Sequence, residues 1–154
     1  MCLAIIAPKG TNKYSDIIIN AIKIAAGTNK DGAGYAFRER GVVYYNKGLY
    51  KSADELIDDL REDNITEDAD LIIHLRNGNV GTVSIENCHP FVLSDKDEEI
   101  NSDSGITDKG VLIHNGTIFK YQNYQSLTSD TYDFVKEFMY IPEFISLLKR
   151  DMKI

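Results

Sequence analysis

The stretch YAFRERGVVYYNK, residues 35–47, decides the fold class of this chain. Its two halves, 35–38 and 42–47, are rich in the aromatic and β-branched residues that strands favour. The polar sequence Glu39-Arg40-Gly41 lies between them. Two such runs joined by a short turn containing Gly predict a β-hairpin, in which the neighbouring strands run antiparallel.

On both sides of this hairpin, the spacing of apolar residues predicts further short strands and amphipathic helices. The expected elements are a buried strand at 2–7, a helix at 15–26 that Gly27 ends, a helix at 53–61 with Ser52 as its N-cap, and a buried strand at 70–75.

The second half of the chain has a less regular pattern. Residues 93–107 are acidic and rich in Ser, Asp and Asn, so we expect an exposed loop. Residues 110–121 suggest a second hairpin, with a tight turn at Asn115-Gly116. Two helices are expected near the C-terminus, one at 130–139 after a cap at Thr128 or Ser129, and one from 142 to about 149.

Mixed helices and strands with several hairpins predict an α+β fold with antiparallel pairing, rather than a series of β-α-β units. No internal repeat or linker divides the sequence, so we expect residues 1–154 to form a single domain.

The composition limits the classes of partner. The 154 residues carry a formal net charge of -7 at pH 7, so neither nucleic acid nor an anionic membrane surface is an expected partner. No apolar stretch approaches the roughly 20 residues that span a bilayer, and residues 1–9 lack the features of a signal peptide. We therefore expect a cytoplasmic protein in which Cys2 and Cys88 remain separate thiols.

Cys2 is the first candidate for chemistry. Methionine aminopeptidase generally removes Met1 before a small second residue, which would leave Cys2 with a thiol and a free α-amine. An α-amine has a pKa of about 7.7 to 8.0, close to the range of a general base. Nucleophile and base would then share one residue. The alternative is that Cys2 is a small apolar residue at the start of a buried strand.

Further polar motifs follow Cys2 along the chain. They are Asp31-Gly32-Ala33-Gly34, His74-Leu75-Arg76 with Gly81 and then Glu86-Asn87-Cys88-His89-Pro90-Phe91, and His114-Asn115-Gly116 with Ser129-Asp130-Thr131. In this order, and with Cys at position 2, the sequence resembles the class II glutamine amidotransferases, which are N-terminal-nucleophile hydrolases. Residues 2–135 carry the resemblance.

The resemblance implies a four-layer αββα sandwich, shortened at its C-terminus, that hydrolyses glutamine to glutamate and ammonia through a Cys2 thioester. No cofactor is implied. Small stand-alone proteins of this kind are similar to ones encoded by bacteria and phages. The chain has no acceptor domain, so a separate synthetase is the implied user of the ammonia.

The resemblance also assigns roles to particular residues. The Asn115 side chain and the Gly116 N–H would form the oxyanion hole. Arg76 would bind the α-carboxylate of glutamine and Asp130 its α-ammonium, while Gly81 and Asn87 complete the substrate-binding set.

Other interpretations of these residues stay open. Asn115-Gly116 can be a hairpin turn alone, and Asp130 a helix cap alone. The three histidines and two cysteines are suitable zinc ligands, but their spacing matches no short ligand pattern, so no metal is expected.

The sequence departs from the family at Leu3, where Gly is usual, and in the loop 77–80, which would shape the glutamine pocket. A different amide substrate, such as a γ-glutamyl or acyl-amino compound, is therefore an alternative. A non-catalytic protein that retains the fold is another.

Overall fold

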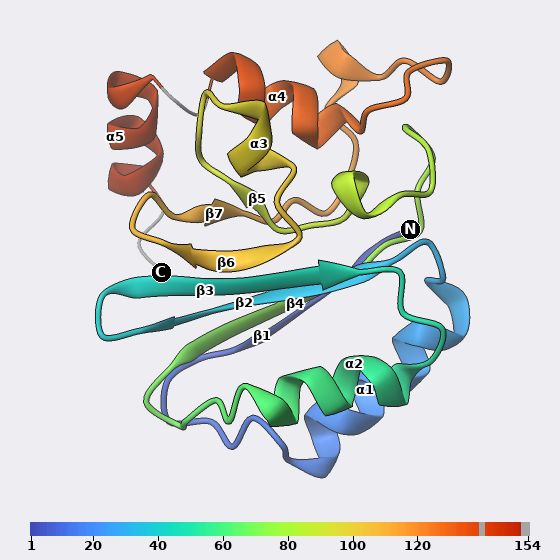
Figure 1. Ribbon diagram of the computed structural model, residues 1–154, viewed down its shortest axis with the longest axis vertical. Helices are drawn as coiled ribbons and strands as arrows, with labels where there is room; N and C mark the ends of the chain where they lie inside the picture. The colour runs from blue at the N-terminus through green and yellow to red at the C-terminus, as the bar shows by residue number, and fades with distance from the viewer. Residues whose placement is uncertain (139–140, 152–154) are drawn as a thin grey trace.

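The computed structural model describes residues 1–138 and 141–151, and in them helices and strands are mixed along the chain (Figure 1). The strands are β1 (Leu3–Ala7), β2 (Ala33–Glu39), β3 (Val42–Gly48), β4 (Asp70–Leu75), β5 (Phe91–Val92), β6 (Ser104–Thr107) and β7 (Val111–Leu112). The helices are α1 (Asp16–Thr28), α2 (Ala53–Glu62), α3 (Asp97–Ile100), α4 (Asp130–Phe138) and α5 (Pro142–Asp151), with 3-10 turns at Ile85–Asn87 and Phe119–Tyr121.

A five-stranded antiparallel sheet with the order β1-β4-β2-β3-β6 forms the centre of the fold. The predicted hairpin is its β2–β3 pair, which closes at Glu39 and Val42. Arg40 and Gly41 both have positive φ, which lets the chain reverse within two residues. The predicted α+β class with antiparallel pairing is confirmed.

Helices α1 and α2 cover one face of this sheet (Figure 1). Successive strand residues point to opposite faces, so alternate positions of β4, Leu71 and Ile73 among them, face these helices. Both are at most 2% exposed, and they share a core cluster with Ile22 of α1 and Leu56 of α2. Burial of these apolar side chains fixes the sheet on the helix pair.

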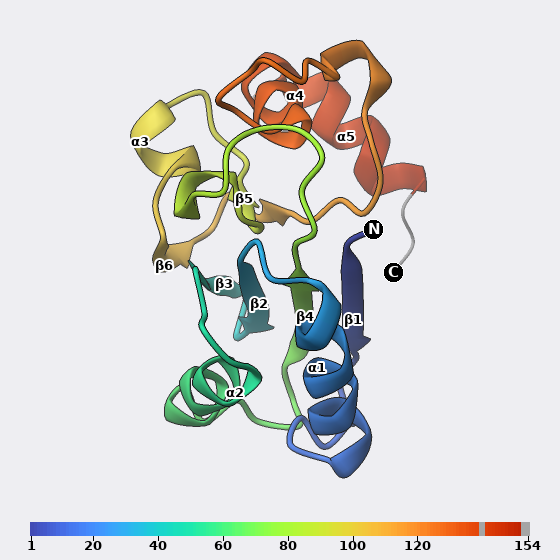
Figure 2. The same cartoon turned by 90° about the vertical axis from the view of Figure 1, so that its right-hand side faces the viewer.

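The opposite face of the sheet carries the short ribbon β5–β7, and α3, α4 and α5 lie beyond the ribbon (Figures 1 and 2). A second core cluster joins this ribbon to α3 and α4. Its fully buried centre consists of Phe91, Ile100 and Val135, with Tyr132 at its edge. None of the helices among the described residues is long and apolar enough to cross a membrane.

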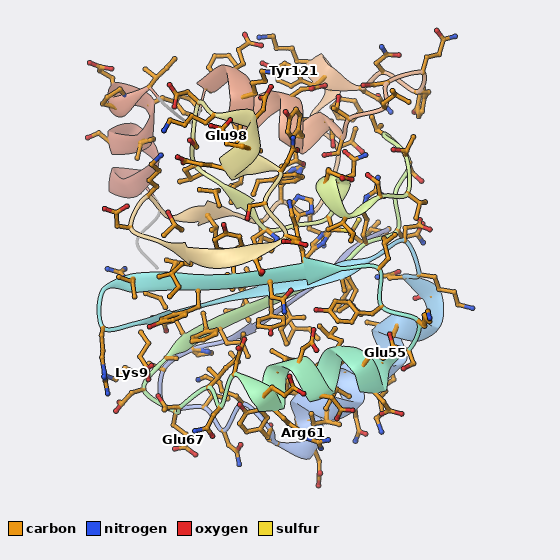
Figure 3. The ribbon with its side chains drawn as sticks, viewed as in Figure 1. Lys9, Glu55, Arg61, Glu67, Glu98 and Tyr121 are labelled. Carbon is orange, nitrogen blue, oxygen red and sulfur yellow. The ribbon has the colours of Figure 1, made fainter. Side chains whose placement is uncertain are left out.

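The N-terminus of α2 has the predicted cap. The Glu55 N–H donates to Ser52 Oγ at 3.3 Å, and the Glu55 carboxylate in turn accepts from the Lys51 N–H at 2.8 Å. Glu55 lies near the start of this helix, as Figure 3 shows. At α4, Ser129 is the cap, because its Oγ accepts from the Tyr132 N–H at 3.2 Å.

Gly27 does not end α1, contrary to the sequence prediction. The helix continues to Thr28, and the Asn29 N–H closes the last turn on Ala25 O at 2.9 Å. Gly27 therefore lies inside the helix, where its missing side chain weakens the helix without breaking it.

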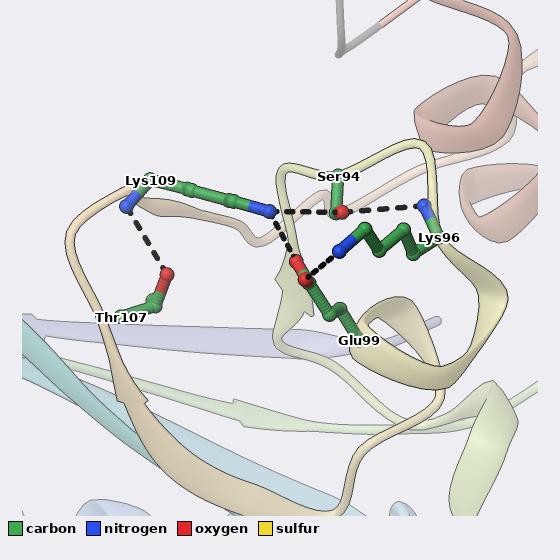
Figure 4. Close-up of polar contacts among 5 residues, drawn as sticks. All are labelled: Ser94, Lys96, Glu99, Thr107 and Lys109. Carbon is green, nitrogen blue, oxygen red and sulfur yellow. Dashed lines mark hydrogen bonds and ion pairs between the residues drawn. The ribbon is translucent and has the colours of Figure 1, made fainter.

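The prediction that 93–107 is an exposed loop is wrong. The segment contains α3, and its end forms β6, which pairs with β3 in the main sheet. Around α3, Glu99 forms ion pairs with Lys96 and Lys109 (Figure 4). The acidic residues face outward, whereas Ile100 is fully buried. The composition of the segment indicates that its acidic residues are exposed, but it does not reveal that Ile100 is buried.

The second predicted hairpin, over 110–121, is also wrong. Val111 and Leu112 pair with β5 instead of with the segment that follows them. The following segment is held elsewhere, because the Ile118 N–H donates to Asp130 Oδ2 at 2.6 Å, and it continues into a 3-10 turn. Asn115-Gly116 therefore lies in an open connection, not in a two-residue turn.

Candidate active site

A cavity of about 590 Å³ lies where the first residues of the chain meet the loop after β4, the segment after β7 and the start of α4. In Figure 2 the start of β1 lies beneath the segment that joins β7 to α4. The cavity is lined by five residues predicted from the sequence, namely Cys2, Arg76, Asn115, Gly116 and Asp130.

Cys2 owes its place to the pairing of β1 with β4. Leu3 is opposite Leu75, so the preceding Cys2 lies beside the first residues of the loop after β4. Its Sγ accepts a hydrogen bond from the Asn77 N–H at 3.3 Å and is 3.5 Å from Asn77 O. The sulfur therefore lies against the backbone of Asn77, which lines the same cavity. Met1 precedes it, 91% exposed, and also lines the cavity.

Arg76 is only 3% exposed, and its guanidinium shapes the loop that follows it. Nη2 donates to Val80 O at 2.8 Å and Nη1 to Thr82 O at 3.1 Å. The loop passes so close that a Cβ on Gly78 would be 2.6 Å from the guanidinium carbon. A guanidinium has five N–H donors, so others remain for a ligand in the cavity.

Asp130, at the first turn of α4, is 7% exposed and joins two segments. Oδ2 accepts from the Ile118 N–H at 2.6 Å, and Oδ1 accepts from the Thr131 N–H at 2.9 Å. The contact with Ile118 holds the segment that carries Asn115 and Gly116 against the helix. Both of these residues are exposed at the cavity rim.

Gly81 and Asn87, also predicted to bind substrate, are not among the described residues that line the cavity. Asn87 Nδ2 donates to Leu127 O at 2.7 Å, and its Oδ1 accepts from the Ser129 N–H at 2.7 Å. Gly81 has a φ of 77°, and a Cβ there would lie 2.8 Å from the Ser129 nitrogen. Both residues contact the segment before α4 and hold it against the loop after Arg76. They therefore stabilise the walls of the cavity without lining it.

Two histidines are buried next to the cavity. The ring centres of His74 and His89 are 4.2 Å apart, and none of their four ring nitrogens has a hydrogen-bond partner among the described residues. Burial, together with the nearby positive charge of Arg76, lowers the pKa of His74 to about 4. Burial likewise holds the pKa of His89 well below its usual value. Both rings are therefore neutral at pH 7.

His114 differs from these two histidines because one of its nitrogens has a partner. Its Nδ1 is 3.3 Å from Thr131 Oγ1, and the residue lines the cavity together with His89. Among the described residues, no group of three or more His, Cys, Asp and Glu side chains is arranged to hold a metal ion.

Two further titratable groups are buried in the fold and do not line the cavity. Lys47 is 2% exposed, donates to Ile100 O at 3.2 Å and lies 4.9 Å from the Phe91 ring centre, and burial lowers its pKa to about 8. Burial raises the pKa of the Cys88 thiol to about 11. A Cβ on Gly32 would lie 2.2 Å from Cys88 Sγ, so Cys88 packs against bare backbone. Cys88 is therefore an inert packing residue.

Sequence reasoning did not assign a role to Asn77 or Thr131. Asn77 contacts the Cys2 thiol through its backbone, which no side-chain pattern reveals, and only the β1–β4 register predicts that contact. Thr131 follows Asp130 directly and lines the cavity with it.

Comparison of the chain with protein-family models, curated proteins and solved structures finds no match.

Proposed function

We propose that this protein hydrolyses the side-chain amide of glutamine, with Cys2 as an N-terminal nucleophile after removal of Met1. The observation that carries the proposal is the convergence of Cys2, Arg76, Asn115 and Asp130 on one cavity. These residues come from four separate parts of the sequence, and each supplies a group that this reaction requires.

Recognition of a free amino acid requires one cation and one anion at the same site. Arg76 supplies buried positive charge, and two of its donors are already used by the loop, so it is held in a fixed orientation. Asp130 supplies the negative charge on another wall of the cavity. Together they favour the α-carboxylate and α-ammonium of glutamine over a peptide-linked side chain, which lacks both charges.

In the proposed reaction the Cys2 thiol gives its proton to its own α-amine and attacks the amide carbon. The carbon–nitrogen bond then breaks, and the nitrogen leaves as ammonia with the proton from the α-ammonium. Water next adds to the thioester while the α-amine takes up a proton, and the thiolate leaves and is reprotonated. The Asn77 N–H stabilises the sulfur whenever it is negative.

The negative oxygen of each tetrahedral intermediate needs donors that are already in place. The Asn115 side-chain amide and the Gly116 N–H are at the rim of the cavity that Cys2 lines. A donor of this kind contributes roughly 3 kcal/mol to stabilisation of the transition state.

The arrangement of layers supports the same family. Two helices, a large sheet, a small ribbon and further helices follow one another. We propose that this order is a reduced form of the four-layer αββα sandwich of N-terminal-nucleophile hydrolases. A separate synthetase that accepts ammonia, and a cytoplasmic location, belong to this proposal.

The test is ammonia release from glutamine by the untagged protein, with intact mass used to establish that Met1 is absent. Cys2→Ala should abolish release, whereas Cys88→Ala, which removes the packing thiol, should retain it if the variant folds. Full activity of Cys2→Ala, or of protein that retains Met1, would refute the mechanism.

One observation favours a second candidate, an amidase for an acyl-amino compound that lacks an α-carboxylate. The guanidinium of Arg76 is hydrogen-bonded to Val80 O and Thr82 O, so part of its capacity for a carboxylate is occupied. Parallel assays on glutamine and on such amides distinguish the two, because only the second activity would survive Arg76→Met.

A further inference from the structure

The sequence contains two Asn-Gly pairs, at 77–78 and 115–116, and both line the same cavity. Asn-Gly is chemically labile, because the glycine nitrogen can attack the asparagine side chain when no side chain on the second residue obstructs it. The two pairs are in opposite environments, so the fold determines which of them reacts.

The glycine nitrogen of the first pair is restrained. The Gly78 N–H donates to Asp31 Oδ2 at 2.9 Å, and a hydrogen bond to a charged acceptor is among the stronger ones in proteins. The backbone of Asn77 is fixed as well, through its two contacts with Cys2 Sγ. The attacking nitrogen is therefore occupied, and the backbone on its N-terminal side is held in place.

The glycine nitrogen of the second pair is free. Asn115 and Gly116 are both exposed, and Gly116 N–H makes no hydrogen bond within residues 1–138 and 141–151. Gly116 has a φ of 145°, which glycine adopts without strain. The His114 ring is close, because its Nε2 would be 3.4 Å from a Cβ on Gly116. An imidazole at this position can accept the proton of the attacking N–H.

We infer that Asn115 is a site of spontaneous deamidation, which converts the cavity rim from a neutral amide to a carboxylate. The Gly116 nitrogen loses its proton and bonds to the Asn115 side-chain carbon, and the bond from that carbon to Nδ2 breaks with release of ammonia. Water then opens the resulting succinimide at either carbonyl, giving aspartate or isoaspartate. The step needs no co-reactant besides water.

This inference is independent of the proposed glutaminase activity, since it concerns the chain's own side chain. The change would nevertheless affect any chemistry in this cavity. It removes an N–H donor and adds a negative charge near Asp130, so the cavity would lose affinity for a developing oxyanion. The site would therefore lose its original form slowly, at the rate at which Asn115 deamidates in the folded protein.

The experiment is to incubate the full, untagged chain at mildly alkaline pH in water labelled with oxygen-18, and to follow both asparagines by peptide mass spectrometry. We expect the label to enter the Asn115 peptide, as aspartate and isoaspartate, at least about tenfold faster than the Asn77 peptide. A hydrogen bond to a charged group changes an equilibrium constant by about that factor or more.

Two comparisons show whether the fold is responsible. In strong denaturant the two asparagines should react at similar rates, and in folded Asp31→Ala the reaction of Asn77 should accelerate towards that of Asn115. Equal rates in the folded native chain, or no conversion at Asn115, would overturn the inference. Because the measurement is of mass, inactivity towards glutamine does not affect it.

Discussion

Asp130 Oδ2 accepts a hydrogen bond from the backbone N–H of Ile118 at 2.6 Å, and this contact fixes the course of the chain beside the cavity. It explains why residues 117–121 do not return as a strand. It also gives Asp130 a structural role besides the proposed recognition of an ammonium group.

The two roles of Asp130 can be separated by comparing Asp130→Asn with Asp130→Ala. Asn keeps one acceptor oxygen, which can serve Ile118 but not Thr131 as well, so Asn should lower the free energy of unfolding by less than Ala does. Ala leaves both N–H groups without this acceptor and should cost about 1 to 3 kcal/mol. Denaturant unfolding measures this difference. Both variants should lose affinity for glutamine, and an Asn variant with native affinity would contradict the proposed recognition.

Asn87 should be important for stability although it does not line the cavity. Its side chain hydrogen-bonds to Leu127 O and the Ser129 N–H while 3% exposed, so Asn87→Ala should lower the free energy of unfolding by about 2 kcal/mol or more. Thermal or denaturant unfolding tests this. A matched control is Asn123→Ala, at an exposed position, which should have a smaller effect.

Ser52 and Ser15 provide a paired test of helix capping. Ser52 Oγ accepts from the Glu55 N–H, whereas Ser15 occupies the same position at α1 without a side-chain capping bond. Ser52→Ala should therefore cost about 1 kcal/mol of stability, and Ser15→Ala much less. Equal losses in denaturant unfolding would show that the Ser52 bond does not stabilise α2.

Glycine substitutions should have opposite signs at two positions. Gly27 lies inside α1 with open space around its Cα, so Gly27→Ala should stabilise the protein by about 0.5 to 1 kcal/mol. Gly81→Ala should destabilise it, because φ is positive and the new Cβ would meet backbone atoms of 128–129. Melting temperatures of the two variants provide the measurement.

Acid should weaken the fold through the buried histidines. The pKa of His74 is about 4 in the folded chain and about 6.5 when unfolded, so the unfolded state binds the proton first as pH falls. The stability is complete above pH 6.5 and decreases between 6.5 and 4, by a total on the order of 3 kcal/mol for His74. The free energy of unfolding across this range measures the loss.

A substitution at His74 tests whether this residue causes the loss of stability in acid. His74→Leu removes this titration, so its stability should depend less on pH between 6.5 and 4 than that of the native chain. His114→Gln is the control, since His114 is only half-buried and has a hydrogen-bond partner. An unchanged pH dependence in His74→Leu would exclude His74 as the source.

Local pattern was sufficient to predict the β2–β3 hairpin, the capped helix α2 and strand β4, because neighbouring residues determine each of them. The local pattern did not predict strands whose pairing partner is distant in the sequence. The strand at 111–112 pairs with 91–92, and 104–107 pairs with β3, and neither relation can be read from nearby residues.

The same distinction applies to the site. The residue types, their order and the resemblance that they carry indicated five residues that the structure brings together at the cavity. Gly81 and Asn87 were assigned to substrate by resemblance, whereas their contacts with 127–129 brace the loop. Such bracing depends on packing between segments 40 or more residues apart, which a motif does not describe.

Strand β6 belongs to the large sheet, although the segments before and after it, β5 and β7, form the small ribbon. The chain thus runs from the ribbon to the large sheet and back to the ribbon. The two layers cannot separate unless the hydrogen bonds between β3 and β6 break. We therefore expect a molecule to enter the cavity through movement of the surrounding loops, with the β3–β6 pairing intact.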